Sequence, residues 1–491
     1  MYHSRSGGSY LILIVLIVGL LVSPRVALAR RKVAPKPAQT PASVVTPVPA
    51  QTPAPVVTPL PAPIPSVSGP AYFIDSVAGN DLNAGTSDTA PWRTLAKVQS
   101  ALNAGSIAPG TSFLFKSGDV WTASNKGNPM VSLPTGLNGA NGNPILFATY
   151  GSGPAPVFDG SSGLATACFY GNGASAATPY VSYVAISGFE CRNTSLYGVY
   201  FHQDSGSGAG MPGIIVENMN IHNTGPGAFS GADLNNSCGP SPCDDGNYRN
   251  QLMFEDDSYA LDGAQLLSNL VDTCGGHNCI ELQGDMGAGT IQNSVCYSWT
   301  HNCIDVKQSV GILVKGNIVH GGTATQGSAF YYENDNSPAN GSITWEQNLA
   351  YSASNGLECE NGTPTQHTVA CSAYNNTLYL GSESAIVSAS TSGLTWDVRN
   401  NILDTTDPIF VCDTMNSNSC GEITTWNYND DGGSHGYVNT AVVGPNDLTG
   451  GTTPNNPLYV DAAGADFHLQ AGSPCINTGD PTLGAINIGA F

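Results

Sequence analysis

The stretch His277-Asn278-Cys279-Ile280-Glu281-Leu282-Gln283 returns after 24 residues as His301-Asn302-Cys303-Ile304-Asp305-Val306-Lys307, with its polar and apolar positions unchanged. A repeat of this length around a short alternating strand is typical of one turn of a stacked β solenoid. Side chains alternate across a strand, so in each copy the Ile points into the stack and the acidic residue points outward. Function should therefore depend on the outward side chains.

Three further segments align with this pair, and together they predict five stacked strands. The aligned strands are Cys279–Gln283, Cys303–Lys307, Ala329–Glu333, Gly356–Glu360 and Ala385–Ala389. The inward stack is Ile280, Ile304, Phe330, Leu357 and Ile386. The first outward column is Glu281, Asp305, Tyr331 and Glu358, and the second is Gln283, Lys307, Glu333 and Glu360. Because neighbouring strands lie about 4.8 Å apart, these columns are dense with carboxylates and contain one Lys.

An Asn follows the preceding strand of each turn, which predicts an internal ladder of side-chain amides. Each amide would hydrogen-bond to the next turn, where the backbone bends. We assign these residues a structural role and no part in catalysis. They are Asn269, Asn293, Asn317, Asn348, Asn376 and Asn401.

The N-terminal region predicts an exported protein. Residues 1–29 read as a signal peptide, with Arg5 before the apolar run Leu11–Val22 and a small-residue cleavage site ending at Ala29. The run is short for a membrane span of about 20 residues. We therefore expect a secreted protein without stable membrane insertion. The alternative is an uncleaved anchor at the cell surface, because Arg30-Arg31-Lys32 follows directly.

Residues 30–69 form a Pro/Ala/Thr-rich linker, and residues 70–491 form a single folded domain. Dense Pro in the linker favours extended polyproline II and excludes a packed core. The domain carries 9 of the 15 Lys and Arg against all 36 Asp and Glu, a net charge of about −27. Binding of nucleic acid is not expected, because it requires clustered cations. We expect a monomer whose partner is an extracellular polysaccharide.

All 13 Cys lie beyond the linker, where an exported protein can form disulfides. Cys238 could pair with Cys243 and Cys412 with Cys420 across short loops. Cys279 and Cys303 occupy equivalent places on adjacent turns, so they too could be bridged. A zinc site built from the cysteines at 274, 279, 296 and 303 is a weaker alternative, because paired C-x2-C units are missing. The odd count leaves at least one thiol.

The start of the domain predicts a cap. Pro91 precedes a helical stripe of Trp92, Leu95, Val98 and Leu102, and a solenoid must cover its first turn. The segments in this region are YFIDSVAGNDLNAGTSDTAPWRTLAKV (72–98), FLFKSGDVW (113–121), NPILFATYG (143–151) and PVFDGS (156–161). These segments, with the tail at 455–480, resemble secreted bacterial proteins of the pectate-lyase-like superfamily. The resemblance implies an all-β fold, a single-stranded right-handed parallel β-helix with an N-terminal capping helix.

The resemblance also implies activity on a polysaccharide, and a lyase acting by β-elimination is the preferred reading. Such a reaction needs a base and a positive charge that stabilises an enolate-like anion. Lys307 would be the base, and Asp305, Glu281 and Glu333 would complete the catalytic group. Calcium is the expected cofactor, with Glu281, Asp305, Glu333 and Glu358 as ligands. Lys307 beside carboxylates should hold its proton tightly unless a metal offsets their charge.

Two other readings stay open. A glycoside hydrolase needs two carboxylates, and Glu281 with Asp305, or Asp305 with Glu333, could serve. A non-catalytic glycan-binding or surface protein would use the same residues as a solvated face. Tyr331, Glu358 and Glu360 are the expected substrate contacts.

Residues around the predicted site are expected to play supporting roles. Tyr332 should point into the core, because alternate residues of a strand face opposite sides. Trp299 and Trp345 could stack on sugars. His277 and His301 should be structural hydrogen-bonders. An irregular insert at 230–262, which contains Glu255-Asp256-Asp257, could form one wall of the cleft at the predicted site.

Overall fold

The computed structural model describes the folded part of the chain with gaps. The described residues are 62–63, 65–173, 181–203, 210–225, 252–256, 261–274, 278–299, 301–322, 327–334, 339–362, 367–381, 384–390, 392–412, 420–431, 444–448, 456–484 and 487–491. The predicted signal peptide and almost all of the linker lie outside them. No helix within these ranges is long and apolar enough to cross a membrane.

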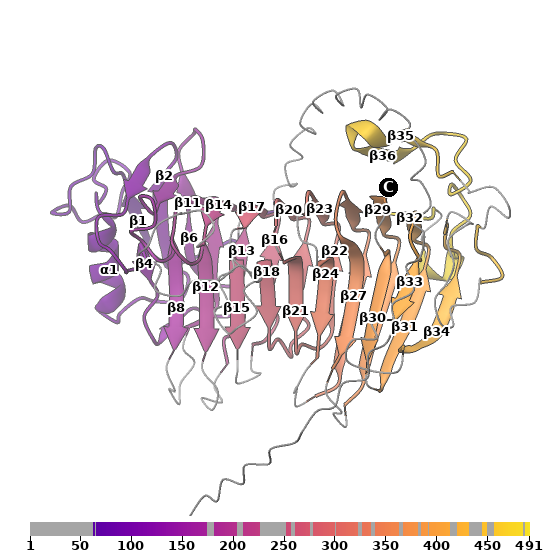
Figure 1. Cartoon of the computed structure of the whole chain (residues 1–491). Coiled ribbons are helices and arrows are strands. Elements are labelled where there is room, and N and C mark those ends of the chain that lie inside the picture. The colour runs from indigo at the N-terminus through magenta and orange to yellow at the C-terminus, as the bar shows by residue number, and fades with distance from the viewer. Residues whose placement is uncertain are drawn as a thin grey trace, which may run out of the picture. The chain divides into compact units, whose positions relative to one another are not determined.

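Three long parallel sheets form the body, and successive strands in the sequence move from one sheet to the next (Figure 1). The first sheet has 12 strands. In order they are β1 (Ala71–Ile74), β2 (Ser112–Lys116), β6 (Ile145–Tyr150), β10 (Val184–Ser187), β13 (Ile215–Glu217), β16 (Gln265–Leu267), β19 (Thr290–Gln292), β22 (Ile312–Lys315), β25 (Gly341–Glu346), β28 (Val369–Tyr374), β31 (Leu394–Arg399) and β34 (Glu422–Asn427).

The second and third sheets each have ten strands in the same progression. The second contains β3 (Val120–Thr122), β7 (Val157–Asp159), β11 (Glu190–Arg192), β14 (Asn220–Thr224), β17 (Leu270–Cys274), β20 (Val295–Tyr297), β23 (Ile318–His320), β26 (Leu349–Tyr351), β29 (Thr377–Gly381) and β32 (Ile402–Thr405). The third contains β4 (Val131–Ser132), β8 (Phe169–Gly173), β12 (Val199–Gln203), β15 (Leu252–Asp256), β18 (Asn278–Gln283), β21 (Asn302–Lys307), β24 (Ser328–Glu333), β27 (Asn355–Asn361), β30 (Ile386–Ser390) and β33 (Phe410–Cys412).

The core lies between the three sheets and consists of stacked rows of like side chains. The predicted inward residues Ile280, Ile304, Phe330, Leu357 and Ile386 are all fully buried on adjacent strands of the third sheet. Each such side chain contributes about 1.5–3 kcal/mol relative to an exposed one. Because one turn covers the next, this row fixes the register of the whole sheet and confirms the predicted alignment.

An Asn ladder runs along a bend of the solenoid, as predicted, with one correction. The side-chain amide of Asn348 donates to Asn376 at 3.0 Å, and that of Asn376 donates to Asn401 at 2.9 Å. Asn317 and Asn429 continue the buried row on either side. Asn293 is not part of it: Ser294 N donates to the Asn317 side chain instead, and Asn293 adopts a left-handed backbone. The ladder supplies acceptors to backbone N–H groups that the bend would leave unpaired.

The N-terminal end is covered by α1 (Leu95–Asn103), which confirms the predicted capping helix. Its Val98 and Leu102 are buried against the first turns. Thr94 is the N-cap residue and accepts from Lys97 N, so Trp92 precedes the helix and forms a bridge to Ile74 in β1. The remaining short elements are β5 (Leu137–Asn138), β9 (Val181–Ser182), β35 (Tyr459–Asp461), η2 (Ala462–Gly464), β36 (Asp466–Leu469) and η3 (Pro481–Leu483).

Candidate functional site

Four adjacent strands of the third sheet, β18, β21, β24 and β27, carry the predicted site. Glu281 pairs with Asp305, Asp305 with Tyr331, and Tyr331 with Glu358. Two positions further along, the partners are Gln283, Lys307, Glu333 and Glu360. Both outward columns therefore have the register that the sequence predicted.

Two carboxylates at the centre of the first column are held by amides. Asn278 Nδ2 donates to Glu281 Oε2 at 2.8 Å and to Asp305 Oδ2 at 2.6 Å. Asn302 Nδ2 donates to the same Asp305 oxygen at 3.1 Å. Glu281 and Asp305 are fully buried, although they point away from the core. A solvated sheet face, as the glycan-binding reading assumed, does not describe these two residues.

Lys307 lies beside both carboxylates. Its Nζ is 3.7 Å from Glu281 Oε1 and 3.9 Å from Asp305 Oδ2, and the residue is only 7% exposed. Both separations are longer than a charge-assisted hydrogen bond of about 2.7–2.9 Å. Charge attraction therefore holds the ammonium group near both carboxylates, and neither of these two distances is that of a short hydrogen bond.

The pKa of Asp305 is strongly perturbed by its surroundings. Burial raises its pKa well above the usual range, opposed by Lys307 and increased by the charges of Glu281 and Glu333. Its Oδ1 is buried and has no hydrogen-bond partner among the described residues. Because two amides hold Oδ2, the proton of the neutral carboxyl group is directed to Oδ1, the oxygen without a partner.

The other half of the site is more open. Tyr331, Glu333, Glu358 and Glu360 are all half-buried. The Tyr331 hydroxyl donates to Glu360, and Ser328 Oγ donates to Glu358. Burial, followed by the charges of the three Glu residues, raises the pKa of Tyr331 well above its usual value. Tyr331 therefore keeps its proton and stays a hydrogen-bond donor.

Several predicted neighbours of the site lie elsewhere. Trp299 and Trp345 are completely buried and cannot stack on a sugar, while Tyr332 points into the core as parity predicted. Glu255 and Asp256 belong to the regular strand β15, not to an irregular insert. His301 bonds to Asn278 through its ring, in keeping with a structural role. His277, Asp257 and residues 230–251 lie outside the described residues.

The acidic columns are the predicted calcium ligands. The carboxylate oxygens of the acidic columns suit calcium chemically. However, within the described ranges the only three potential ligand atoms found within 4.8 Å of one another are the sulfurs of Cys279, Cys296 and Cys303. Calcium therefore stays a prediction.

Cys279 and Cys303 each pair with a cysteine of their own turn. Cys279 bonds to Cys274 and Cys303 to Cys296, so both the predicted Cys279–Cys303 bridge and the zinc alternative are wrong. The physical reason is that each pair meets where one turn bends between the second and third sheets. Cys412–Cys420 is confirmed, whereas Cys238 and Cys243 lie outside the described residues. Two further bridges join Cys168 to Cys191 and Cys359 to Cys371, and Cys475 is a buried free thiol in the part of the chain that the structure describes.

Two features of the site were missed in the sequence. The first is the amide pair Asn278 and Asn302, whose equivalent places in the repeated phrase were a usable signal. The second is an aromatic group in the same sheet, closer to the N-terminus. Tyr170 and Tyr200 pair on β8 and β12, and Tyr197 stacks on Tyr200 with ring centroids 4.1 Å apart. His202 also stacks with Tyr200, with ring centroids 5.6 Å apart.

Comparison with known proteins supports the fold. No family model matches the sequence, and no curated protein matches it. Among solved structures, pectate lyase Pel9A is 16% identical and covers 87% of this chain and 97% of its own, with a TM-score of 0.54. GH136 lacto-N-biosidase from Eubacterium ramulus is 11% identical, with coverage of 75% and 68% and a TM-score of 0.45. An alginate lyase from Paenibacillus sp. is 11% identical, with coverage of 68% and 97% and a TM-score of 0.39. The likeness to pectate lyase Pel9A shows the fold alone, which is a right-handed parallel β-helix.

Proposed function

We propose that this protein acts outside the cell on a uronate-containing polysaccharide and cleaves it by β-elimination, with Lys307 as the base. The observation that carries the proposal is the placement of the Lys307 ammonium group 3.7 Å and 3.9 Å from two carboxylates on the outward face. The protein shares its fold with a pectate lyase, and this analogy supports elimination as the class of reaction. Five disulfides among the described residues favour an oxidising compartment.

The reaction transfers a proton to the base and breaks one glycosidic bond. The base removes the proton at the carbon beside the uronate carboxylate, a carbon–carbon double bond forms to the next carbon, the bond from that carbon to the glycosidic oxygen breaks, and the leaving oxygen takes a proton from water. Lys307 Nζ would receive that proton and so must be neutral when it acts. The raised pKa of Asp305 helps, because a carboxyl that is less ionised at a given pH holds the proton on Lys307 less strongly.

Asp305 would also form a hydrogen bond with the uronate carboxylate. In its protonated form, the unbonded Oδ1 can donate a hydrogen bond to that carboxylate as negative charge builds on it. Asn278 and Asn302 keep Oδ2 occupied, which directs the proton to Oδ1. Glu281, paired with Lys307, would hold the base in position. Tyr331, Glu358 and Glu360 would contact the neighbouring sugar.

Glycoside hydrolysis is the second candidate, and one observation favours it. Since Asn278 Nδ2 bonds to both carboxylates at 2.8 Å and 2.6 Å, the two bonded oxygens lie no more than about 5.4 Å apart. Retaining glycosidases place their carboxyl groups about 5–5.5 Å apart, with one of them protonated. Asp305 would be the acid and Glu281 the nucleophile.

One pair of assays separates these reactions. Pectate, alginate and other uronate polymers are incubated with the protein, and absorbance near 235 nm reports the unsaturated product. Reducing ends are measured in parallel on neutral glycans. Elimination predicts absorbance that Lys307→Met abolishes. Reducing ends without absorbance, lost in Glu281→Gln, would indicate a hydrolase, and silence in both assays would favour a glycan-binding protein.

Calcium is tested in the same experiment. A requirement for calcium would appear as activity lost with a chelator and restored by calcium alone. Glu333→Gln and Glu358→Gln should then weaken the restored activity, because these half-buried carboxylates are the accessible candidate ligands.

A further inference from the structure

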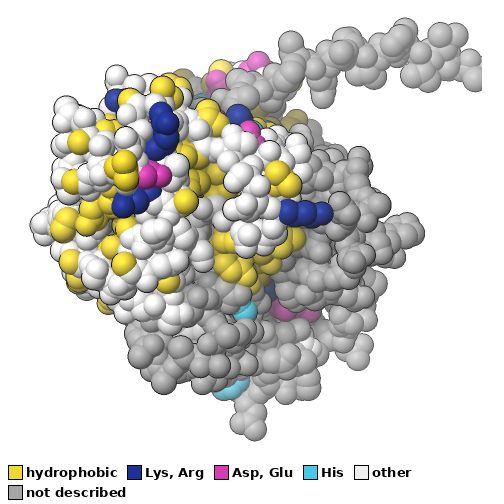
Figure 2. Space-filling model, turned by 90° about the vertical axis from the view of Figure 1, so that its left-hand side faces the viewer, with side chains coloured by type: hydrophobic (Ala, Val, Ile, Leu, Met, Phe, Trp, Pro, Cys, Tyr) yellow, Lys and Arg dark blue, Asp and Glu magenta, His cyan; other side chains and the backbone are white. Residues whose placement is uncertain are grey.

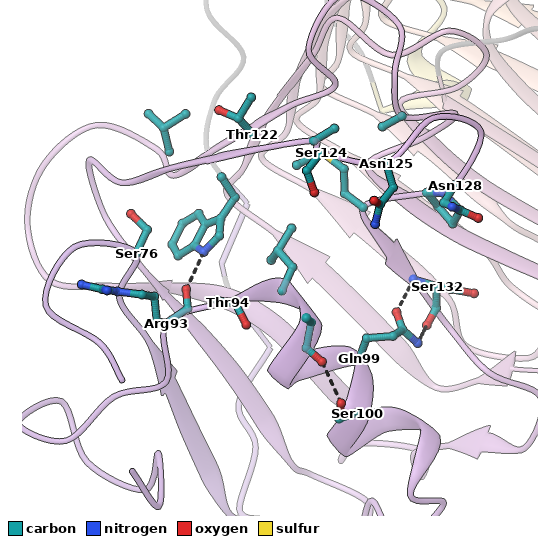
Figure 3. A pocket seen from close by; sticks show the side chains of 18 of the residues that line it. Ser76, Arg93, Thr94, Gln99, Ser100, Thr122, Ser124, Asn125, Asn128 and Ser132 are labelled. Carbon is teal, nitrogen blue, oxygen red and sulfur yellow. Dashed lines mark hydrogen bonds between the residues drawn. The ribbon is translucent and has the colours of Figure 1, made fainter. Parts of the chain in front are cut away.

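A pocket of about 870 Å³ lies in the N-terminal cap, away from the carboxylate columns (Figure 3). One wall is a face of α1, from Leu95 to Asn103, and the other is the segment 120–132. Gln99 joins the walls: its Nε2 donates to Ser132 O at 2.8 Å, and its Oε1 accepts from Ser132 N at 2.9 Å. Trp121 Nε1 donates to Arg93 O at 3.1 Å at the other end. These bonds fix the two walls relative to each other, so the pocket is preformed.

The lining has the chemistry of a sugar-binding surface. Amides and hydroxyls predominate, and no Asp or Glu is among the lining residues that the structure describes. Apolar surface from Val120, which is 45% exposed, and Met130 lies between them. Polar groups around a small apolar surface can bind sugar hydroxyls while the ring covers the apolar part. The polar lining includes Ser76, Ser100, Thr122, Ser124, Asn125 and Asn128.

The cap is also the part of the domain that repels anions least. Residues 71–135 contain four basic and four acidic residues, whereas residues 136–491 contain five basic and 32 acidic ones. Figure 2 looks onto this end and shows basic side chains spread among uncharged and hydrophobic surface, with few acidic ones. Asp81, close to the helix start, is already occupied by Arg93 N and by Thr94. A polyanion can therefore approach this end more easily than the rest of the molecule.

Arg93 supplies a cation at the pocket. It is exposed, and one of its terminal nitrogens donates to Val77 O at 2.6 Å, which fixes the side chain. A guanidinium group has five N–H donors and matches a carboxylate in a bidentate geometry. The bond to Val77 orients the group and leaves donors for a ligand.

We propose that this pocket is a second, non-catalytic binding site for a uronate-containing oligosaccharide. Arg93 receives a uronate carboxylate, and the amides and hydroxyls of the lining receive ring hydroxyls. The class of ligand rests on the proposed function, whereas the existence of the site does not. Ser132 in β4 lines the pocket, and β18 lies four strand positions away in the third sheet, or about 19 Å. One polymer chain can therefore occupy both places and gain avidity.

The test measures binding of oligouronates of four and eight sugars to the full-length Lys307→Met protein, in which turnover is blocked. Calorimetry gives the stoichiometry, and hydrogen-exchange mass spectrometry locates protected amides. The proposal predicts protection within 95–103 and 120–132, in addition to any at 278–283 and 302–307. A neutral tetrasaccharide such as cellotetraose should bind the pocket at least about five-fold more weakly, because it lacks the carboxylate for Arg93.

Three pocket variants probe the site by different means. Arg93→Gln removes the cation, Asn128→Asp adds a charge with almost no change in shape, and Ser100→Trp fills the space from the exposed side of α1. Each should weaken tetrauronate binding at the pocket about five-fold or more and remove the protection at 95–103. Two control variants should leave both unchanged. Lys116→Gln makes the same charge change as Arg93→Gln in the same cap but outside the pocket, and Leu82→Trp adds an indole at a position that is 93% exposed.

The outcomes separate this proposal from the proposed function. Unchanged binding and unchanged protection in all three pocket variants would overturn the second site. Equal binding of cellotetraose and tetrauronate would overturn the role of Arg93. Protection at the pocket without any at 278–283 and 302–307 would support this inference and count against the proposed catalytic face. The reverse pattern would do the opposite.

Discussion

Replacing Asp305 with Asn should make the protein more stable at neutral pH while removing activity. The substitution removes a buried negative charge and keeps the shape. The carbonyl oxygen of the new amide can accept the bonds from Asn278 and Asn302, and the amide NH2 group takes the place of the unbonded Oδ1. Lys307 loses a partner at 3.9 Å but keeps Glu281 at 3.7 Å. Removing a buried charge whose hydrogen bonds are retained should stabilise by on the order of 1–4 kcal/mol.

The sign follows from linkage. The folded-state pKa of Asp305 is raised above its ordinary value of 3.8, so folding becomes less favourable as the pH rises from that value through the folded pKa. The advantage of Asp305→Asn should therefore vanish below about pH 3.8 and grow as the pH rises above that value toward the folded-state pKa. For a unit of this length, about 1 kcal/mol corresponds to roughly 1 °C in Tm. We expect Asp305→Asn to raise Tm by about 1–4 °C at pH 7, measured by calorimetry at both pH values.

Asp285→Asn is the matched contrast. Asp285 is also buried, and burial raises its pKa, yet both of its oxygens accept backbone N–H bonds. The donors are Gly263 and Gly287 to Oδ1, and Ala264 to Oδ2. An amide NH2 must face at least one of these donors, which costs about 1–3 kcal/mol and lowers Tm. If Asp305→Asn also lowers Tm at pH 7, or if its effect does not depend on pH, the assignment of Asp305 as a buried carboxyl with a raised pKa is refuted.

Three further results are expected. Lys307→Met should lower the rate of elimination by about 10²–10⁴-fold, because it removes the base, and should leave the circular dichroism spectrum unchanged; retained absorbance at 235 nm would exclude Lys307 as the base. Asn376→Ala should destabilise by about 1–3 kcal/mol, since it removes the acceptor of the Asn348 backbone N–H and of one Asn348 side-chain N–H, and the side-chain donor to Trp345 O. Asn125→Ala, at an exposed position, is the control and should change Tm by less than about 1 °C. Cys475 should resist iodoacetamide at pH 8 in the folded protein and react after denaturation, because burial raises the pKa of its thiol and Asp430 accepts its hydrogen bond; rapid labelling of the native protein, seen by peptide mass spectrometry, would contradict the buried thiol.

The register of the third sheet could be predicted because the sequence repeats it openly. The phrase at 277–283 and its copy at 301–307 align Glu281 with Asp305, and strand alternation then decides which side chains enter the core. Alternation gives only the direction of a side chain, however. It does not show that Glu281 and Asp305 are completely buried.

Contacts between different sheets were harder to predict from the sequence than the register within one sheet. Cys279 and Cys303 are equivalent in the repeat, which favoured a bridge between turns, but each bonds to a cysteine that arrives from the second sheet. Ser294 replaces Asn in the ladder because a hydroxyl can also bond at that bend, and a pattern built on Asn alone selected its neighbour. The cap pocket depends on how α1 packs against residues 120–132. The repeat pattern of the sequence does not predict this packing.

Asn side chains lie at two bends of a turn, where they pair with the backbone at one bend and with carboxylates at the other. In the long ladder, each Asn side chain bonds to the next Asn and to backbone, so its donors and acceptor are used by the fold. At the entry to the third sheet, Asn278 and Asn302 also begin such a stack, since Asn302 N donates to Asn278 and Ser328 N donates to Asn302. Here, however, the NH2 groups turn to Glu281 and Asp305. A stack that accepts from the backbone with its oxygens and donates to carboxylates with its nitrogens fixes two acidic groups by hydrogen bonds. The solenoid can therefore position an acid beside a lysine using the same residue type that closes its turns.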